Sequence, residues 1–319
     1  MKKFLQVTAI GLSLFALVAC GQQTTNNTAN VETNNAATES VAEKGAYTVT
    51  DIQGREVSFE KVPEKVVAIN PSNTEMLDAI GAADKIVARG SYVMYPESVA
   101  TLPEVESGSK LNVEQIIALE PDVVFMSVMD QSVEQIEALE KAGVPVVMTD
   151  HKNTLEEVYQ GIQLVGQVMD KEDEANQVVE NMKTSFEELA KNKEANEGKT
   201  VYFEVSPLEY GLWTSGKGTF MQEVADIIGM KNIFDDVEGW AEVSEEQVLE
   251  RNPDYIVTIT MYYGEGPSPE EEIPSRPGWE NVTAVKENHI LHIKDDLLSK
   301  SSPRLVEGAK AFSDFVNEK

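Results

Sequence analysis

A short segment of this chain occurs twice, 132 residues apart. The stretch EQIIALEPDVV begins at Glu114, and EQVLERNPDYI begins at Glu246, with no gap between the aligned residues. In each copy the apolar spacing is typical of one helix face, a proline ends the helix, and an apolar run then predicts a buried strand. A helix, a turn and a strand repeated in the two halves of one chain predict two similar lobes.

Each copy places a glutamate near the first turn of its helix, Glu114 in the first copy and Glu246 in the second. A carboxylate there interacts favourably with the positive end of the helix dipole, which stabilises a helix by about 0.3–1 kcal/mol. This structural role is a common one. The residues alone leave open whether the two glutamates have a further role.

The N-terminus predicts export. Two lysines at positions 2 and 3 precede an apolar run at residues 10–19, which is too short to cross a bilayer and is typical of a secretory signal. The run ends in Leu17-Val18-Ala19-Cys20, which resembles a bacterial lipobox. The resemblance implies cleavage before Cys20 and a lipid on its sulfur, so we predict a signal peptide at residues 1–19 and membrane attachment through Cys20.

The next segment predicts a tether. Residues 20–45 are rich in Asn, Thr, Ala and Gln and have no periodic apolar face, which favours a disordered linker. Cys20 is the only cysteine of the chain, so a disulfide within the chain is excluded. A lipobox followed by such a tether suits a protein on a Gram-positive surface.

Charge excludes some classes of partner. The formal net charge is −29, and removing the signal takes away two lysines and no acid, so the mature chain is more acidic still. Such a surface repels phosphate backbones and anionic lipids. We therefore expect no nucleic-acid partner, and a membrane association that comes from the lipid alone.

Strands alternate with helices from Tyr47 onward, which predicts α/β lobes. A single proline-free helix from Thr154 to Ala195 would be about 60 Å long, longer than a lobe is wide, so we expect a break near Asp170 to Asp173. The predicted domains are an N-terminal lobe at 46–170, a bridging helix at 171–197 and a C-terminal lobe at 198–319. Because a helical bridge is stiff, the lobes should move little on binding.

The sequence offers no catalytic set, so we expect no enzyme. The stretch from Gly211 to Gly218 is close to a P-loop but has glycine where the motif needs Ser or Thr. Two of the three histidines, His289 and His292, are spaced to lie on opposite faces of a strand, which does not suit a shared metal. No metal site and no cofactor are predicted.

Aromatic residues stand beside Gly, Pro or Ser at the ends of predicted strands, where the binding residues of α/β sheets collect. Any one of them could simply pack in a core. Together they favour a cleft lined with aromatic rings, and they are Tyr92, Tyr95, Trp213, Trp240 and Trp279.

These features together resemble the helical-backbone substrate-binding proteins of ABC importers, which carry ferric siderophores, haem and cobalamin. The repeat carries the resemblance together with Asn70-Pro71-Ser72-Asn73-Thr74-Glu75 and Ser302-Pro303-Arg304. It implies the class III periplasmic-binding-protein fold, with two Rossmann-like lobes joined by a long rigid helix. It also implies that Glu114 and Glu246 dock on a permease dimer, and that the protein works as a monomer.

Within that family the ligand segments are most similar to those of cobalamin-binding proteins. The similarity implies that Tyr92, Trp213 and Trp240 stack on a corrinoid and that Asp296 accepts hydrogen bonds from its amides. The contact set implied by the resemblance is Ser72, Asn73, Tyr92, Trp213, Trp240, Asp296 and Lys300.

Two departures and one scarcity bear on the ligand. Gly108 stands where cobalamin-binding proteins can have tryptophan, and Lys300 stands where they can have arginine. The loops offer few basic residues for an anionic siderophore, namely Arg89, Lys217, Arg276, Lys300 and Arg304. We therefore expect a corrinoid, with a ferric siderophore or haem as the alternative, and a bare metal ion or a surface enzyme as weaker ones.

Overall fold

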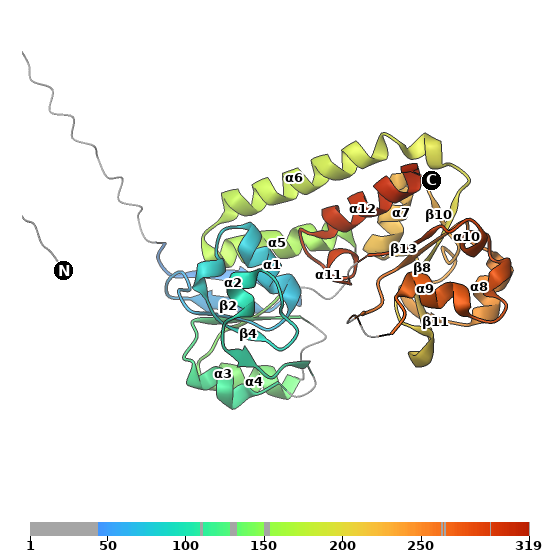
Figure 1. Cartoon of the computed structure of the whole chain (residues 1–319). Helices are drawn as coiled ribbons and strands as arrows, with labels where there is room; N and C mark the ends of the chain where they lie inside the picture. Colours follow the sequence, from blue (N-terminus) through green and yellow to red (C-terminus); the bar gives the residue numbers. More distant parts are fainter. Residues whose placement is uncertain are drawn as a thin grey trace, which may run out of the picture. The chain divides into compact units, whose positions relative to one another are not determined.

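The computed structural model describes residues 44–108, 111–127, 133–149, 154–262, 264, 266–293 and 295–318. Residues Glu43–Lys319 form one compact unit, whose course is drawn in Figure 1. The predicted signal peptide, Cys20 and nearly all of the predicted tether lie outside the described residues. No helix among the described residues is long and apolar enough to cross a membrane.

The N-lobe is built on a parallel sheet of five strands in the order β5-β4-β3-β6-β7. Chain order runs outward in both directions from the neighbouring strands β3 and β6, so the sheet is doubly wound. The strands are β3 (Val66–Ala68), β4 (Ile86–Gly90), β5 (Glu104–Val105), β6 (Val123–Met126) and β7 (Val146–Met148).

The C-lobe repeats this topology with four parallel strands in the order β10-β8-β12-β13. The strand that follows each copy of the sequence repeat, β6 or β12, pairs in both lobes with the first strand of its sheet. Their starts, Val123 and Tyr255, keep the 132-residue spacing of the repeat. The strands are β8 (Thr200–Glu204), β10 (Lys231–Asn232), β12 (Tyr255–Thr258) and β13 (Ile290–His292).

Helices cover both faces of each sheet, and strand alternation sends neighbouring side chains into different cores. Val124 of β6 packs in a core beneath α3 and α4, whereas Phe125 joins the core on the opposite face. The N-lobe helices are α1 (Pro71–Ala79), α2 (Glu97–Ala100), α3 (Val113–Ala118) and α4 (Val133–Lys141). Those of the C-lobe are α7 (Phe220–Ile228), α8 (Glu245–Arg251), α9 (Pro269–Glu272), α10 (Thr283–Lys286), α11 (Asp295–Leu298) and α12 (Leu305–Glu318).

Two helices connect the lobes, α5 (Leu155–Met169) and α6 (Glu172–Ala190). A capping box between Thr154 and Glu157 starts α5. Helix α5 ends at Asp170, whose left-handed backbone (φ 55°) turns the chain directly into α6. This confirms the break expected near Asp170 to Asp173. Helix α6 ends at Ala190, whereas the bridging helix was predicted to reach residue 197.

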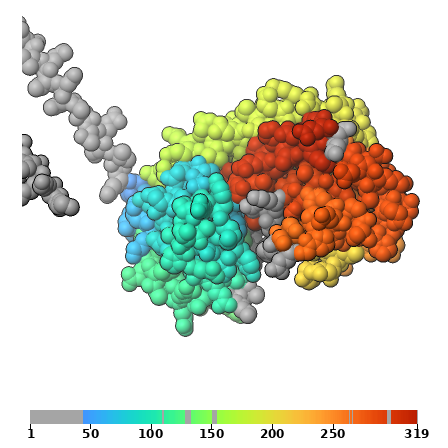
Figure 2. All heavy atoms as spheres, in the orientation of Figure 1, coloured from blue at the N-terminus to red at the C-terminus, as the bar shows by residue number. Residues whose placement is uncertain are grey.

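One core runs through both lobes along these helices. A single buried cluster joins Phe125 of the N-lobe sheet to Phe203 of the C-lobe sheet through apolar side chains of α5, α6 and α12. In Figure 2 the yellow-green residues of α6 lie along the upper margin, above both lobes. The sheets are therefore held by packed helices rather than by extended crossovers, while the residue boundaries predicted for the two lobes stay a prediction.

Two small antiparallel sheets complete the unit: β1 (Tyr47–Thr50) with β2 (Glu56–Phe59), and β9 (Leu212–Ser215) with β11 (Trp240–Val243). The first is a hairpin. Its turn is fixed by buried Asp51, which accepts hydrogen bonds from the backbone N–H groups of Gln53, Arg55 and Met148. The Arg55 guanidinium also donates to the Asp51 carboxylate, with a closest contact of 2.7 Å.

Gly166 allows the close approach of α5 and α6. A Cβ at this position would lie 2.5 Å from Ala175 Cβ and 2.9 Å from the backbone oxygen of Lys171. We expect Gly166→Ala to lower the free energy of unfolding by about 1–3 kcal/mol, because overpacking forces backbone shifts. Urea denaturation measures the change.

A compensating variant provides the control. Ala175→Gly removes the carbon that the new methyl group meets, so its cost should be smaller in the Gly166→Ala background than in the wild type. Strictly additive effects would contradict a steric contact between these two positions.

Candidate functional site

The two repeat glutamates occupy equivalent exposed places. Glu114 lies in the first turn of α3, which Asn112 caps by accepting from the Gln115 N–H at 3.0 Å. Glu246 lies in the first turn of α8, which Ser244 caps by accepting from the Gln247 N–H at 3.3 Å. Hydrogen bonds from its own backbone and from Ser244 lower the pKa of Glu246. The repeat helix of each lobe thus begins with an exposed carboxylate.

Exposed apolar side chains collect in the loops that follow the parallel strands. Among the described residues, seven of the eight exposed large apolar side chains lie after β4, β8 or β12 or on β9, and Val133 is the exception. We call these seven the apolar loop surface. They are Tyr92, Met94, Tyr95, Tyr210, Trp213, Met261 and Tyr262. Several are more than half exposed, including Tyr92 at 68% and Tyr210 at 76%. Ligands of open α/β sheets bind outside the carboxyl ends of the strands, which is where these loops begin.

Trp213 and Trp240 lie on neighbouring strands of the β9–β11 sheet. The register pairs Trp240 with Ser215 and Glu242 with Trp213, which places both tryptophans on one face of the ribbon. Trp213 is 40% exposed. Trp240 is half-buried and packs edge-on against Phe220, with ring centroids 5.8 Å apart. Trp213 is therefore the more accessible of the two rings.

A cavity of about 650 Å³ opens beside the C-lobe part of this surface. The segments after β8 and β12 enclose it, and α9 contributes one wall. Its lining combines rings and a thioether with three carboxylates: Tyr210, Met261 and Tyr262 with Glu204, Glu209 and Glu272. A cavity of this size can take a sizeable group of a ligand.

Arg276 neutralises two of those carboxylates, Glu204 and Glu272. Its guanidinium makes paired hydrogen bonds to Glu204 at 2.7 and 2.9 Å and to Glu272 at 2.6 Å. Burial disfavours the charged form, but the two carboxylates outweigh it and hold the pKa of Arg276 above its usual value. The guanidinium also lies over the Trp279 ring, 4.6 Å from its centroid.

The other basic residues near the loops also have acidic partners. Arg89 pairs with Glu104 at 3.4 Å, Lys217 with Glu238 at 3.5 Å, and Arg304 with Glu75 at 3.5 Å. Arg89, Lys217, Arg276 and Arg304 are thus paired with acids of the protein itself.

The structure corrects one aromatic prediction. Trp279 is fully buried, and its indole N–H donates to Glu245 at 2.8 Å, so it belongs to the C-lobe core and not to a cleft. Tyr202 and Phe234 pack in the same core. A tryptophan beside Gly and Pro therefore has a structural role here.

The remaining predicted contacts lie in different surroundings. Ser72 and Asn73 begin α1 and are buried, and Asn73 Oδ1 accepts a hydrogen bond from the Thr149 hydroxyl. Lys300 is half-buried after α11. Asp296 lies in α11, but its side chain is outside the described part. Tyr92 and Trp213 are thus the predicted contacts that the structure clearly exposes.

Sequence reasoning missed four members of the apolar loop surface. Met94 stands between the two tyrosines already singled out, and Tyr210 precedes the glycine of the P-loop-like stretch. Met261 and Tyr262 follow the strand of the second repeat copy. Their signal was available, because each follows a predicted strand within a few residues.

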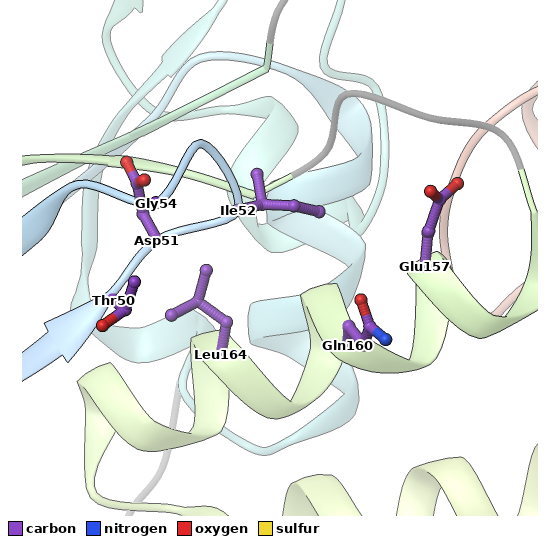
Figure 3. A pocket seen from close by; sticks show the side chains of 7 residues that line it. All are labelled: Thr50, Asp51, Ile52, Gly54, Glu157, Gln160 and Leu164. Carbon is purple, nitrogen blue, oxygen red and sulfur yellow. The ribbon is translucent and has the colours of Figure 1, made fainter.

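A second cavity, of about 320 Å³, lies between the β1–β2 turn and α5 in the N-lobe. Figure 3 shows Leu164, Gln160 and Glu157 of α5 on one side and Ile52 and Asp51 on the other. Asp51 and Glu157 are already occupied by the turn and by the α5 capping box. The cavity therefore separates structural elements and has the character of a packing gap.

Among the described residues no cluster of three His, Cys, Asp or Glu could hold a metal ion.

Known proteins resemble the chain over most of its length. A Bacillus subtilis protein named as an uncharacterized ABC transporter substrate-binding lipoprotein, YvrC, is 33% identical over 274 residues, covering 84% of this chain and 85% of its own. A vitamin B12-binding protein of Pectobacterium carotovorum is 27% identical over 254 residues, covering 78% of this chain and 87% of its own.

A solved structure and a family comparison agree with these relatives. The structure of a possible iron-binding, periplasmic solute-binding protein from Staphylococcus epidermidis is 29% identical, with a TM-score of 0.67, and covers 80% of this chain and 99% of its own. The fold is the mixed α/β, parallel-sheet class III periplasmic-binding-protein fold. Residues 66–297, most of the chain, match the family described as periplasmic binding protein. The chain belongs to the periplasmic binding protein family.

Proposed function

We propose that this chain is an extracytoplasmic solute-binding protein, anchored by a lipid on Cys20, that captures a corrinoid such as cobalamin and delivers it to an ABC import permease. It binds and transfers its ligand without catalysing a reaction. The observation that carries the choice of ligand is the apolar loop surface, whose neighbouring cations are already paired with acids.

The chemistry of the surface favours a bulky ligand without net negative charge. Aromatic rings and thioethers offer large contact areas to a flat macrocycle. Glu209, the cavity carboxylate that Arg276 does not neutralise, can accept hydrogen bonds from amide groups and repels carboxylates of a ligand. Cobalamin is amide-rich and close to neutral, whereas many ferric siderophores are anionic. The named ligand of the Pectobacterium relative supports the same choice.

A ferric siderophore or haem is the second candidate. One observation favours it, because the Staphylococcus structure, at 29% identity, is described as possibly iron-binding. Tyr92, Tyr95 and Trp213 could equally contact a haem face or the apolar part of a siderophore. The two candidates share the same surface and differ in the charge and metal of the ligand.

Delivery to the permease is assigned to the repeat glutamates. Glu114 and Glu246 carry one exposed carboxylate on each lobe, at equivalent places in two topologically similar sheets. A permease built as a dimer could offer two equivalent arginine pockets to this arrangement, with paired hydrogen bonds at each. The helix-dipole role is compatible with this and needs no partner.

The ligand proposal is tested by titrating residues 43–319 with cyanocobalamin and following heat by calorimetry. The fragment begins at Glu43 because Lys44 pairs with Asp170 and Glu172 at 3.1 and 2.8 Å. We expect saturable one-to-one binding. Trp213→Ala should weaken it by about 2 kcal/mol, or roughly 30-fold in Kd, because the exposed indole is a large contact.

Val133→Ala is the matched control, since it also truncates an exposed apolar side chain but is not one of the seven residues of the apolar loop surface. Wild-type affinity in Trp213→Ala would remove this surface from the binding site. Absence of cobalamin binding, with binding of haemin or a ferric hydroxamate in its place, would favour the second candidate.

The docking proposal is tested with Glu114→Ala and Glu246→Ala. Each loses a charge-assisted contact of about 1.5–3 kcal/mol, so cellular uptake of labelled cobalamin should fall at least about tenfold. Ligand affinity of the purified variants should stay unchanged. Glu134→Ala serves as the control, because Glu134 is also an exposed first-turn acid, in α4. Normal uptake by the double variant would leave the two glutamates with the helix-dipole role alone.

A further inference from the structure

Arg304 is a C-lobe residue whose main contacts lie on the N-lobe. It immediately precedes α12, which packs on the C-lobe through an edge-to-face contact of Phe312 with Phe203. Its Nη1 lies 3.5 Å from Oε1 of Glu75 on α1, and its Cζ lies 4.1 Å from the ring centroid of Tyr95. Figure 1 shows α12 (red) beginning on the N-lobe side. Arg304 therefore links the two lobes by a side chain.

The electrostatic setting makes this link firm. The side chain of Glu75 is only 1% exposed and that of Arg304 is 16% exposed. A buried carboxylate needs a nearby cation, and removing one partner of such a pair leaves an uncompensated charge. Arg304 also reaches Glu307 at 3.5 Å, which helps to set the orientation of its planar group. The position of the guanidinium is therefore determined from both lobes.

The guanidinium of Arg304 lies over the Tyr95 ring. A cation over an aromatic ring is attracted by the ring quadrupole, and the planar guanidinium stacks well. Tyr95 remains 38% exposed and belongs to the apolar loop surface, three residues after Tyr92. Arg304 thus supports a ring that still faces solvent on the remainder of its surface.

We propose that Arg304 is a positioning residue for the ligand site: it stacks on Tyr95 across the lobes, with buried Glu75 as its counterion, and holds the N-lobe part of the apolar loop surface in its binding orientation. The proposal rests on the proposed function, since it takes that surface as the ligand site. It adds a residue that acts without touching the ligand. It also makes the N-lobe half of the site dependent on a C-lobe side chain.

A double-mutant cycle on the intact protein tests the link, with cyanocobalamin as the probe. Arg304→Ala and Tyr95→Ala should each raise Kd about tenfold, equivalent to about 1.4 kcal/mol. The Kd of the double variant should be no higher than the higher of the two single-variant Kd values, because both changes remove the same support. Effects that multiply, or an unchanged Kd in Arg304→Ala, would overturn the proposal.

Arg304→Lys separates positioning from stability. Lysine keeps a cation for Glu75 but loses the planar face that stacks on Tyr95. We expect the thermal unfolding midpoint to return close to the wild-type value while Kd remains raised. Recovery of both quantities would show that the charge alone matters and would overturn the role of Tyr95.

Arg251→Ala is the matched control. Its guanidinium also covers a ring, 4.4 Å from the Phe234 centroid, and pairs with Asp236 at 2.6 Å, but it lies in the C-lobe away from the apolar loop surface. It should change stability and leave Kd unchanged. A rise in Kd equal to that of Arg304→Ala would identify a general loss of stability as the cause and overturn the proposal.

A ligand-free measurement separates this proposal from the ligand proposal. With 3-fluorotyrosine in the intact protein, the Tyr95 resonance is assigned by its loss in Tyr95→Phe. Arg304→Ala should shift and narrow this resonance, and Arg251→Ala should not. An unshifted resonance overturns the positioning role. Absence of cobalamin binding together with the expected shift would overturn the ligand proposal alone.

Discussion

The packing of α5 against α6 is the constraint on which the rest of the structure depends. The two helices approach closely at Gly166 and Ala175, and Asp170 reverses the chain between them. Helix α5 belongs to the core beneath the N-lobe sheet, and α6 contacts α7 and α12. One apolar cluster therefore packs both sheets against the same pair of helices. Burial of this cluster, rather than any single polar contact, sets where the loops of each sheet lie.

Three cations near the loops are paired with acids of the protein itself. The cations Arg89, Arg276 and Arg304 each have an acidic partner, and Arg276 shares two carboxylates. Internal pairing of this kind removes free positive charge without removing the donors that order the loops. The exposed side chains of the apolar loop surface are aromatic rings and thioethers, in a chain whose formal net charge is −29.

Local patterns predicted much of the fold. The repeat at Glu114 and Glu246 predicted two similar lobes, because a helix, a proline and an apolar run are each encoded within a few residues. The repeat helices α3 and α8 do begin at or next to the predicted glutamates and end before the prolines. The break at Asp170 was also predictable, from the length that an unbroken helix would have.

The candidate site was less predictable, because its properties depend on partners distant in sequence. The sequence suggested that Trp279 lines a cleft, whereas in the structure its indole N–H donates to Glu245 of another helix. Arg276 looked like a free cation until Glu204, 72 residues away, was seen to face it. Asn73, which the resemblance implied as a ligand contact, is fully buried and accepts a hydrogen bond from Thr149. Burial and pairing of this kind are set by tertiary packing, which single-sequence patterns do not encode.

The chain has only three tryptophans, and they sample three different environments. Trp213 is exposed on the apolar loop surface, Trp240 is half-buried against Phe220, and Trp279 is enclosed with its N–H bonded. Their emission should therefore span red-shifted to blue-shifted light, and acrylamide should quench them in the order of their exposure. The fold thus carries its own optical reference: Trp279 reports the integrity of the C-lobe core, while Trp213 reports what happens at the surface.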